Sequence, residues 1–337
     1  MMEHRYSSES LQAQLASMGG MEAGAALREL VAAGLDRLPF PGGGATLERW
    51  RALAAVGAHD LSLAKLYEGH TDALAILHEA GASLGGPDAL WGTWCAEPPD
   101  ARLLLASAAD GGVVLSGRKA WCSGAQTVSH AVVSCWNEGG EAVLAALDLR
   151  QHGVRVTGEG WHAVGMRGSS SVDVEFDRAA AIPLGAPGFY VARPGFWQGG
   201  AGVAACWFGG ATRLAGALRA RLTGQADPHR LAQLGEVTVA LGASAARMRE
   251  AAAAIDRAPM DNAMLAALSV RLCVEASATA TLAAAGRALG AGPLCKDPAI
   301  ARLVADLPVF MRQSHAERDL EAVGRLVAAA GEPPWTL

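Results

Sequence analysis

The sequence has no cluster of positive charge and no paired-cysteine pattern. Its 337 residues carry a formal net charge of −5 at pH 7. No basic field would attract nucleic-acid phosphates, so we expect no polynucleotide partner. The six cysteines form no Cys-x-x-Cys pair and have no ligand spacing. This pattern favours buried, reduced thiols over a disulfide framework or a metal site, and we expect no bound metal.

Signals for secretion and membrane insertion are also missing. The first eight residues contain no apolar core of the kind that a signal peptide needs. The most apolar later run, residues 201–218, is interrupted by Arg213 and by glycines, which is typical of a buried bundle helix and not of a membrane span. We therefore expect a soluble, cytoplasmic protein with no membrane insertion.

The composition is that of a folded chain of more than one domain. Hydrophobic residues make up 51% and charged residues 18% of the sequence, which excludes a disordered chain. The length suits about two or three domains of roughly 100–200 residues each.

Helical patterns occupy both ends of the chain. Residues 9–38 and 46–81 are rich in Ala and Leu at helical spacing, and a proline–glycine cluster separates them. Towards the C-terminus, four more helices are predicted, whose many Ala and Gly residues allow helix axes to approach closely. Their ranges are 198–222, 228–256, 261–289 and 298–329. Four long antiparallel helices with short connections favour a four-helix bundle.

Between these regions the hydrophobic period changes to that of strands. Short apolar runs alternate with turn residues, and in residues 172–176 apolar side chains alternate with acidic ones, the pattern of a sheet with one wet face. The spacing favours a small antiparallel barrel or sandwich, and the lack of βαβ units disfavours a Rossmann fold. We predict an α+β protein with a helical domain (1–90), a β domain (91–185) and a four-helix bundle (186–337).

Four phrases of this chain resemble motifs of the acyl-CoA dehydrogenase family. The first two are Trp94-Cys95-Ala96-Glu97-Pro98, similar to a strand ending in Thr-Glu-Pro, and Gly117-x-Lys119-x-Trp121-x-Ser123, similar to Gly-x-Lys-x-(Trp/Phe)-Ile-(Thr/Ser). The third runs from Gly165-Met166-Arg167-Gly168-Ser169 to Phe176-Asp177 and Ile182-Pro183. The fourth is Gly290-Ala291-Gly292 followed by Arg302 and Asp306. Each phrase is weak alone, but their order and spacing together are fairly specific.

The resemblance implies FAD, cradled by the β domain. It assigns Trp121 to the isoalloxazine ring, which a rigid aromatic side chain can cover, and a hydroxyl contact to Ser123. Backbone N–H groups at Cys95, Ala96 and Ser123 would bond the pyrimidine edge of the flavin, and such donors favour a reduced, negatively charged flavin. The competing interpretation of Trp121 is an aromatic residue that fills the core at a strand end.

The resemblance assigns further residues outside that cradle. Arg230 is the candidate for an arginine that the family places on the FAD pyrophosphate from a neighbouring subunit, and Gly290 and Gly292 belong to the same cofactor-binding set. Arg167 and Ser169 match the motif beside the flavin and the acyl chain, which makes them substrate-binding candidates. A turn-stabilising role is equally consistent with these two residues.

The catalytic base of the family has no counterpart at its usual position. Dehydrogenation next to a thioester needs a carboxylate to remove the Cα proton. Counting from Asp306 reaches Ser314, with His315 next, and the alternative position near Gln198 has no carboxylate either. On a helix, Asp319 would orient His315, and Glu317 is a fallback base. A solvated, charged helical face is the competing interpretation of this segment.

Three functions remain open on this basis. The first is an FAD-dependent oxidoreductase that oxidises an acyl thioester of CoA or of a carrier protein at Cα–Cβ, with an electron-acceptor flavoprotein as a partner. The second is a flavin monooxygenase on the same scaffold, with His315 beside the flavin. The third is a non-catalytic subunit that pairs with an active homologue, which the missing base favours and which the retained Trp121 and Ser123 oppose. The resemblance also implies a homodimer or homotetramer.

Overall fold

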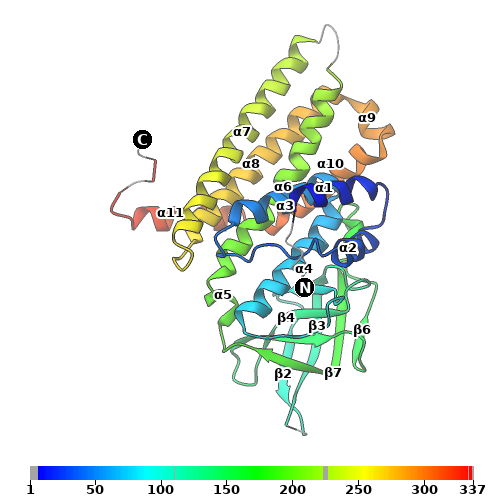
Figure 1. Cartoon of the computed structure of the whole chain (residues 1–337), viewed down its shortest axis with the longest axis vertical. Coiled ribbons are helices and arrows are strands. Elements are labelled where there is room, and N and C mark those ends of the chain that lie inside the picture. Colours follow the sequence, from blue (N-terminus) through cyan, green and yellow to red (C-terminus); the bar gives the residue numbers. More distant parts are fainter. Residues whose placement is uncertain (1–6, 110, 223–226, 333, 336–337) are drawn as a thin grey trace. The chain divides into compact units, whose positions relative to one another are not determined.

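The computed structural model describes residues 7–109, 111–222, 227–332 and 334–335 (Figure 1). Helices precede and follow a run of strands, as expected. By its internal contacts the chain divides into two compact units. Unit 1 combines the residues up to Leu38 with Ser62–Phe196, and unit 2 combines Pro39–Leu61 with the residues from Trp197 onward. The three domain ranges drawn from the sequence stay a prediction.

Unit 1 contains a closed β-barrel. Its strands are β1 (Trp91–Trp94), β2 (Leu103–Ser107), β3 (Val113–Cys122), β4 (His130–Trp136), β5 (Ala142–Asp148), β6 (Val154–Val156) and β7 (Val172–Leu184). Strands β2, β3, β7 and β5 follow one another in the sheet, and β4 closes the ring by pairing with both β5 and β2. Strand β6 pairs with β7 outside this ring, and Figure 1 shows β3 and β7 side by side.

The barrel is antiparallel, as expected, except along one edge of β4. There β4 pairs in parallel with β1 and, at one position, with β2. Consecutive strands β2, β3 and β4 alternate in direction, so β4 runs parallel to β2 once the closing ring brings the two together. This pairing joins strands that are distant in the sequence, and for that reason the local strand pattern did not indicate it.

Helix α4 (Leu61–Glu79) covers part of this barrel. Its Ala73, Ile76 and Leu77 pack against Trp91 and Val132 in one buried cluster. Fully burying an aliphatic side chain of this size contributes roughly 1.5–3 kcal/mol, so this cluster fixes the helix on the sheet. The remaining helices of unit 1 are α1 (Ser8–Ser17), α2 (Ala23–Ala32) and the short α5 (Phe189–Ala192).

A buried histidine joins α4 to the start of β1. The backbone N–H of Trp91 donates to His70 Nδ1 at 3.0 Å, and His70 Nε2 lies 3.1 Å from Asp36 Oδ2. Because Nδ1 accepts, the proton is on Nε2, and the imidazole donates to the aspartate. These two bonds set where β1 begins, ahead of the Trp94 phrase.

Unit 2 is helical. It contains α3 (Thr46–His59), α6 (Gly195–Ala220), α7 (Pro228–Arg257), α8 (Met264–Leu289), α9 (Ala291–Lys296), α10 (Pro298–Phe310) and α11 (Glu317–Ala328). Helices α7 and α8 run side by side (Figure 1), and Ser244 Oγ donates to Ser277 Oγ at 2.8 Å between them. Helix α8 has the length and hydropathy of a membrane span, and 44% of its apolar window is buried inside the protein.

The prediction of one helix over residues 298–329 is wrong. Helix α10 ends at Phe310, a 3₁₀ turn covers Met311–Gln313, and α11 starts at Glu317. Pro308 in the last turn of α10 removes a backbone donor, and Ala316 has a φ of +46°, which no helix allows. The last of the four predicted helices is therefore divided into α10 and α11.

Candidate functional site

Trp121 lies at a β-bulge in unit 1. Lys119 pairs with Val174 and Cys122 with Val172, so β3 takes three steps where β7 takes two. The extra residue bends the strand. Trp121 adopts a φ of +57°, and its side chain is 52% exposed. A tryptophan in this backbone region is strained, and strain of this kind gathers at functional sites. Trp121 therefore does not fill the core.

A second strained segment lies against this bulge. Met166 and Ser170, with φ values of +58° and +44°, flank the 3₁₀ turn Arg167–Ser169. The backbone N–H of Gly124 donates to the carbonyl of Ser169 at 2.7 Å, which joins the two segments. Arg167 is exposed, whereas Ser169 is fully buried, so these two predicted substrate residues differ in what they can contact.

Three serine hydroxyls form a chain between the segments. Ser123 Oγ lies 2.8 Å from Ser171 Oγ, and Ser171 Oγ lies 2.8 Å from Ser169 Oγ. Ser169 Oγ donates to the Met166 carbonyl at 2.7 Å. Ser169 and Ser171 are buried, whereas Ser123 is half-buried and can still meet a ligand.

The backbone around Ser123 is already partly engaged. Its N–H donates to the Trp121 carbonyl at 2.9 Å, and its carbonyl accepts from Trp94 Nε1 at 2.9 Å. A ligand that bonds the Ser123 N–H would compete with the Trp121 carbonyl, and the predicted ligand contact at Ser123 stays a prediction. Cys95 and Ala96 follow directly after β1 and are half-buried. The backbone at these two residues is therefore the second candidate for contact with a ligand.

A buried lysine supports this edge from inside the barrel. Lys119 is fully buried, and its ammonium group donates to Glu97 Oε1 at 2.5 Å, to the Ser134 carbonyl at 2.9 Å and to Ser134 Oγ at 2.7 Å. Glu97 also accepts from Ser134 Oγ and from Trp136 Nε1. Glu97 therefore ties the chain after Ala96 to β3 and β4, and it is a structural partner, not a base.

The charges of this cluster set its ionisation. Burial alone would raise the pKa of Glu97, but the hydrogen bonds from Lys119, Ser134 and Trp136 outweigh it and hold that pKa below its ordinary value. Burial raises the pKa of the Cys95 and Cys135 thiols to about 12. These thiols are therefore protonated and unreactive at neutral pH.

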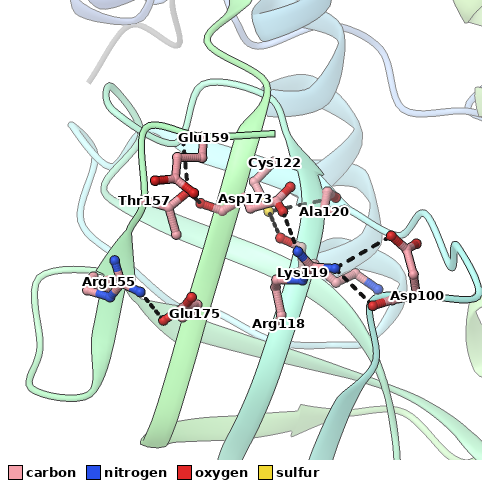
Figure 2. A network of polar contacts seen from close by, with 10 residues as sticks. All are labelled: Asp100, Arg118, Lys119, Ala120, Cys122, Arg155, Thr157, Glu159, Asp173 and Glu175. Atoms are coloured by element: carbon pink, nitrogen blue, oxygen red, sulfur yellow. Dashed lines mark hydrogen bonds and ion pairs between the residues drawn. The ribbon is translucent and has the colours of Figure 1, made fainter. Parts of the chain in front are cut away.

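A separate polar network crosses the barrel surface beside the bulge (Figure 2). Arg118 Nη1 lies 3.1 Å from Asp173 Oδ2, and Arg155 pairs with Glu175. The Asp173 carbonyl accepts from Thr157 Oγ1 at 2.8 Å. Asp173 is 9% exposed because Arg118 and the segment after β6 cover it, so the wet face predicted for β7 is partly covered. The network holds β3, β6 and β7 together.

The two catalytic candidates lie in unit 2. His315 precedes α11 and is not within it, so the helical spacing that predicted its contact is wrong. The contact itself exists, because Asp319 accepts from the His315 backbone N–H at 3.1 Å and lies 3.4 Å from its Nδ1. The His315 side chain is 58% exposed, and Glu317 is exposed in the first turn of α11.

The other residues of unit 2 that the resemblance singled out lie at helix ends or in a surface ion pair. Arg230 is exposed in the first turn of α7. Gly290, at a φ of +65°, ends α8 and precedes α9, which contains Gly292. Arg302 pairs with Asp60 at 3.6 Å. In the described residues, no group of three or more His, Cys, Asp or Glu side chains could hold a metal ion.

Sequence reasoning missed three residues that shape the site. Ser171 completes the hydroxyl chain, Ser134 binds Lys119, and Trp94 supports Ser123. The first could have been found, since Ser169 and Ser171 are two residues apart within a matched phrase. The contact between Ser134 and Lys119 joins two strands and has no local signal.

Comparisons with known proteins agree with this fold. The acyl-CoA dehydrogenase middle-domain family model matches residues 100–179. No match was found among curated proteins. Among solved structures, FMN-bound TdsC from Paenibacillus sp. A11-2 has 18% identity and a TM-score of 0.80 over 94% of each chain. KijD3 in complex with FMN and a dTDP-sugar has 21% identity and a TM-score of 0.80 over 95% of this chain and 92% of that one.

A third structure, methanesulfinate monooxygenase MsuC from Pseudomonas fluorescens, has 19% identity and a TM-score of 0.81 over 98% of each chain. The chain as a whole therefore has the acyl-CoA dehydrogenase-like fold. Its barrel contains the family's middle domain, and the family resemblance drawn from the sequence is confirmed.

Proposed function

We propose that the protein is a flavin-dependent monooxygenase, with the flavin ring on Trp121. The observation that carries this proposal is the half-exposed indole of Trp121, held at a strained bulge beside the half-buried Ser123 hydroxyl. An exposed aromatic face, with a hydroxyl two residues further along the chain, suits a planar, polar ring. Bound there, a flavin would supply two-electron redox chemistry with oxygen.

The residues around Trp121 suit a flavin ring, but the chain lacks the base that an acyl-CoA dehydrogenase reaction requires. That reaction needs a carboxylate base, and the two positions where the resemblance looks for one carry Gln198 and Ser314. The Gln198 carboxamide is buried and donates to the Pro259 carbonyl at 2.8 Å. Ser314 Oγ accepts from the Ala316 N–H at 3.2 Å. Neither can remove a Cα proton.

The form of the flavin is part of the proposal. TdsC and KijD3 have been solved with FMN. Arg230, the candidate for the FAD pyrophosphate contact, is exposed in the first turn of α7. We therefore propose FMN in place of FAD, with the isoalloxazine ring, common to both, bound to unit 1.

A flavin titration of the purified protein tests the proposal. Trp121→Ala should weaken flavin binding by about tenfold, which is the effect of roughly 1.4 kcal/mol of lost ring contact. Trp121→Phe keeps a ring and should retain most of the affinity. Trp335→Ala is the matched control, since Trp335 is also exposed, at 71%, but lies in unit 2. Equal binding by the protein and its Trp121→Ala variant would overturn the placement on Trp121.

Oxygen consumption with supplied reduced flavin separates the two reactions. Uptake coupled to oxygenation of an organic substrate supports the monooxygenase, whereas anaerobic bleaching of bound flavin by an acyl-CoA supports the dehydrogenase. From the family resemblance we propose the His315 imidazole as a proton-transferring group, so His315→Gln should abolish oxygenation. His152→Gln, a change at another exposed histidine, is the control. An unaffected rate in His315→Gln would remove His315 from the site.

A further inference from the structure

The hydroxyl chain of Ser123, Ser171 and Ser169 has a fixed direction. Each serine has a single hydroxyl proton. The carbonyl of Met166 can only accept, so the contact with Ser169 Oγ uses the Ser169 proton. The contact between Ser169 and Ser171 must then use the Ser171 proton. The contact between Ser171 and Ser123 must in turn use the Ser123 proton.

This direction leaves Ser123 with lone pairs only. Ser169 and Ser171 are 0% and 3% exposed, so no solvent competes for their protons. Ser123, the half-buried end of the chain, comes two residues after Trp121, and towards a ligand its Oγ can only accept a hydrogen bond. A ligand that points an N–H at Ser123 Oγ would find a hydrogen-bond acceptor. A ligand with a lone pair at the same place would meet a second lone pair.

We propose that Ser169 and Ser171 are positioning residues that hold Ser123 as a hydrogen-bond acceptor, and that this makes the site select the reduced form of a bound flavin. The inference rests on the proposed flavin site. The oxidised isoalloxazine ring has a ring nitrogen that accepts hydrogen bonds, and two-electron reduction converts it to an N–H. An acceptor at Ser123 distinguishes these two forms, whereas the aromatic face of Trp121 does not.

The diagnostic measurement is a ratio, the dissociation constant of oxidised FMN divided by that of reduced FMN. Oxidised and dithionite-reduced FMN are titrated anaerobically into the full-length protein and its variants. A single net hydrogen bond corresponds to a change of about fivefold. Ser171→Ala frees the Ser123 proton, so Ser123 can donate as well as accept, and the preference for reduced FMN should fall by about that factor. Ser169→Ala should act in the same direction.

Matched variants separate positioning from general damage. Ser171→Thr keeps a hydroxyl and should keep the ratio. Ser107→Ala, at an exposed position on β2, is the control and should change neither constant. Ser123→Ala removes the acceptor and should lower the ratio by itself. The Ser171→Ala change should then have no further effect on the ratio in that background. If Ser171→Ala does not fold, Ser169→Ala and Ser123→Ala carry the same test.

The outcomes are distinguishable. A loss of preference in Ser171→Ala and Ser169→Ala, absent in Ser107→Ala and in the Ser123→Ala background, supports the inference. If the dissociation constants of oxidised and reduced FMN rise by the same factor, their ratio is unchanged. That result would show that the serines only support the fold, and it would overturn the inference. No binding of either form by the wild-type protein would overturn the proposed function and this inference with it.

Discussion

Replacing the buried Lys119 by methionine should destabilise unit 1 strongly. The ammonium of Lys119 is fully buried and donates to three acceptors, two of them on Ser134 and one on Glu97. Methionine keeps the length of the aliphatic stem, so the change removes the charge and its hydrogen bonds and leaves little cavity. The Glu97 carboxylate then loses its cation.

The size of the effect follows from the burial of the pair. Removing one partner of a buried ion pair destabilises a protein by about 3–5 kcal/mol. The Glu97 side chain is 32% exposed and retains its bonds from Ser134 and Trp136, so the lower end applies, about 3 kcal/mol. The double variant Lys119→Met with Glu97→Gln removes both charges and should recover all but roughly 1 kcal/mol, since a neutral replacement of both partners costs little.

Urea unfolding followed by circular dichroism is the assay. At a slope of roughly 2 kcal/mol per molar urea, Lys119→Met should lower the midpoint by about 1.5 M. Lys296→Met, at an exposed lysine at the end of α9, is the matched control and should leave it unchanged. A shift of Lys119→Met no larger than that control, or no recovery in the double variant, would refute the reasoning.

Two further predictions concern unit 1. Because the folded state lowers the pKa of Glu97, its charge stabilises the protein above the ordinary value of 4.5, and this contribution is lost as the pH falls through the lower folded-state pKa. The difference in unfolding free energy between wild type and Glu97→Gln should shrink below about pH 4.5, and a constant difference down to pH 2 would contradict the assignment. Gly117→Ala should cost about 2–3 kcal/mol by thermal unfolding, because Gly117 has a φ of +127° and an added Cβ would lie 2.3 Å from the Arg102 carbonyl. Gly286→Ala, with open space at a helical position, is its control, and an equally mild effect at both sites would refute the steric reason.

The matched phrases were informative because their chemistry is local. The pattern around Lys119, Trp121 and Ser123 predicted a strand that carries an aromatic residue at a site, and the structure has Trp121 exposed at that position. The His315–Asp319 contact was also anticipated, although a turn before α11 produces it and not helical spacing. The continuous helix over residues 298–329 failed, since apolar periodicity continues through a break that Pro308 and Ala316 impose.

The sequence alone determined the order of helices and strands, the family resemblance and the residue types available for a flavin, because each is written in short-range spacing. Only the tertiary structure decided what these residues can do. Pairing of β3 with β7 produces the bulge that exposes Trp121, and the barrel interior turns Lys119 into the partner of Glu97. The approach of two distant segments fixes the hydroxyl chain and so the direction of the Ser123 proton. Strand register and burial set these properties, and both depend on contacts between residues far apart in the chain.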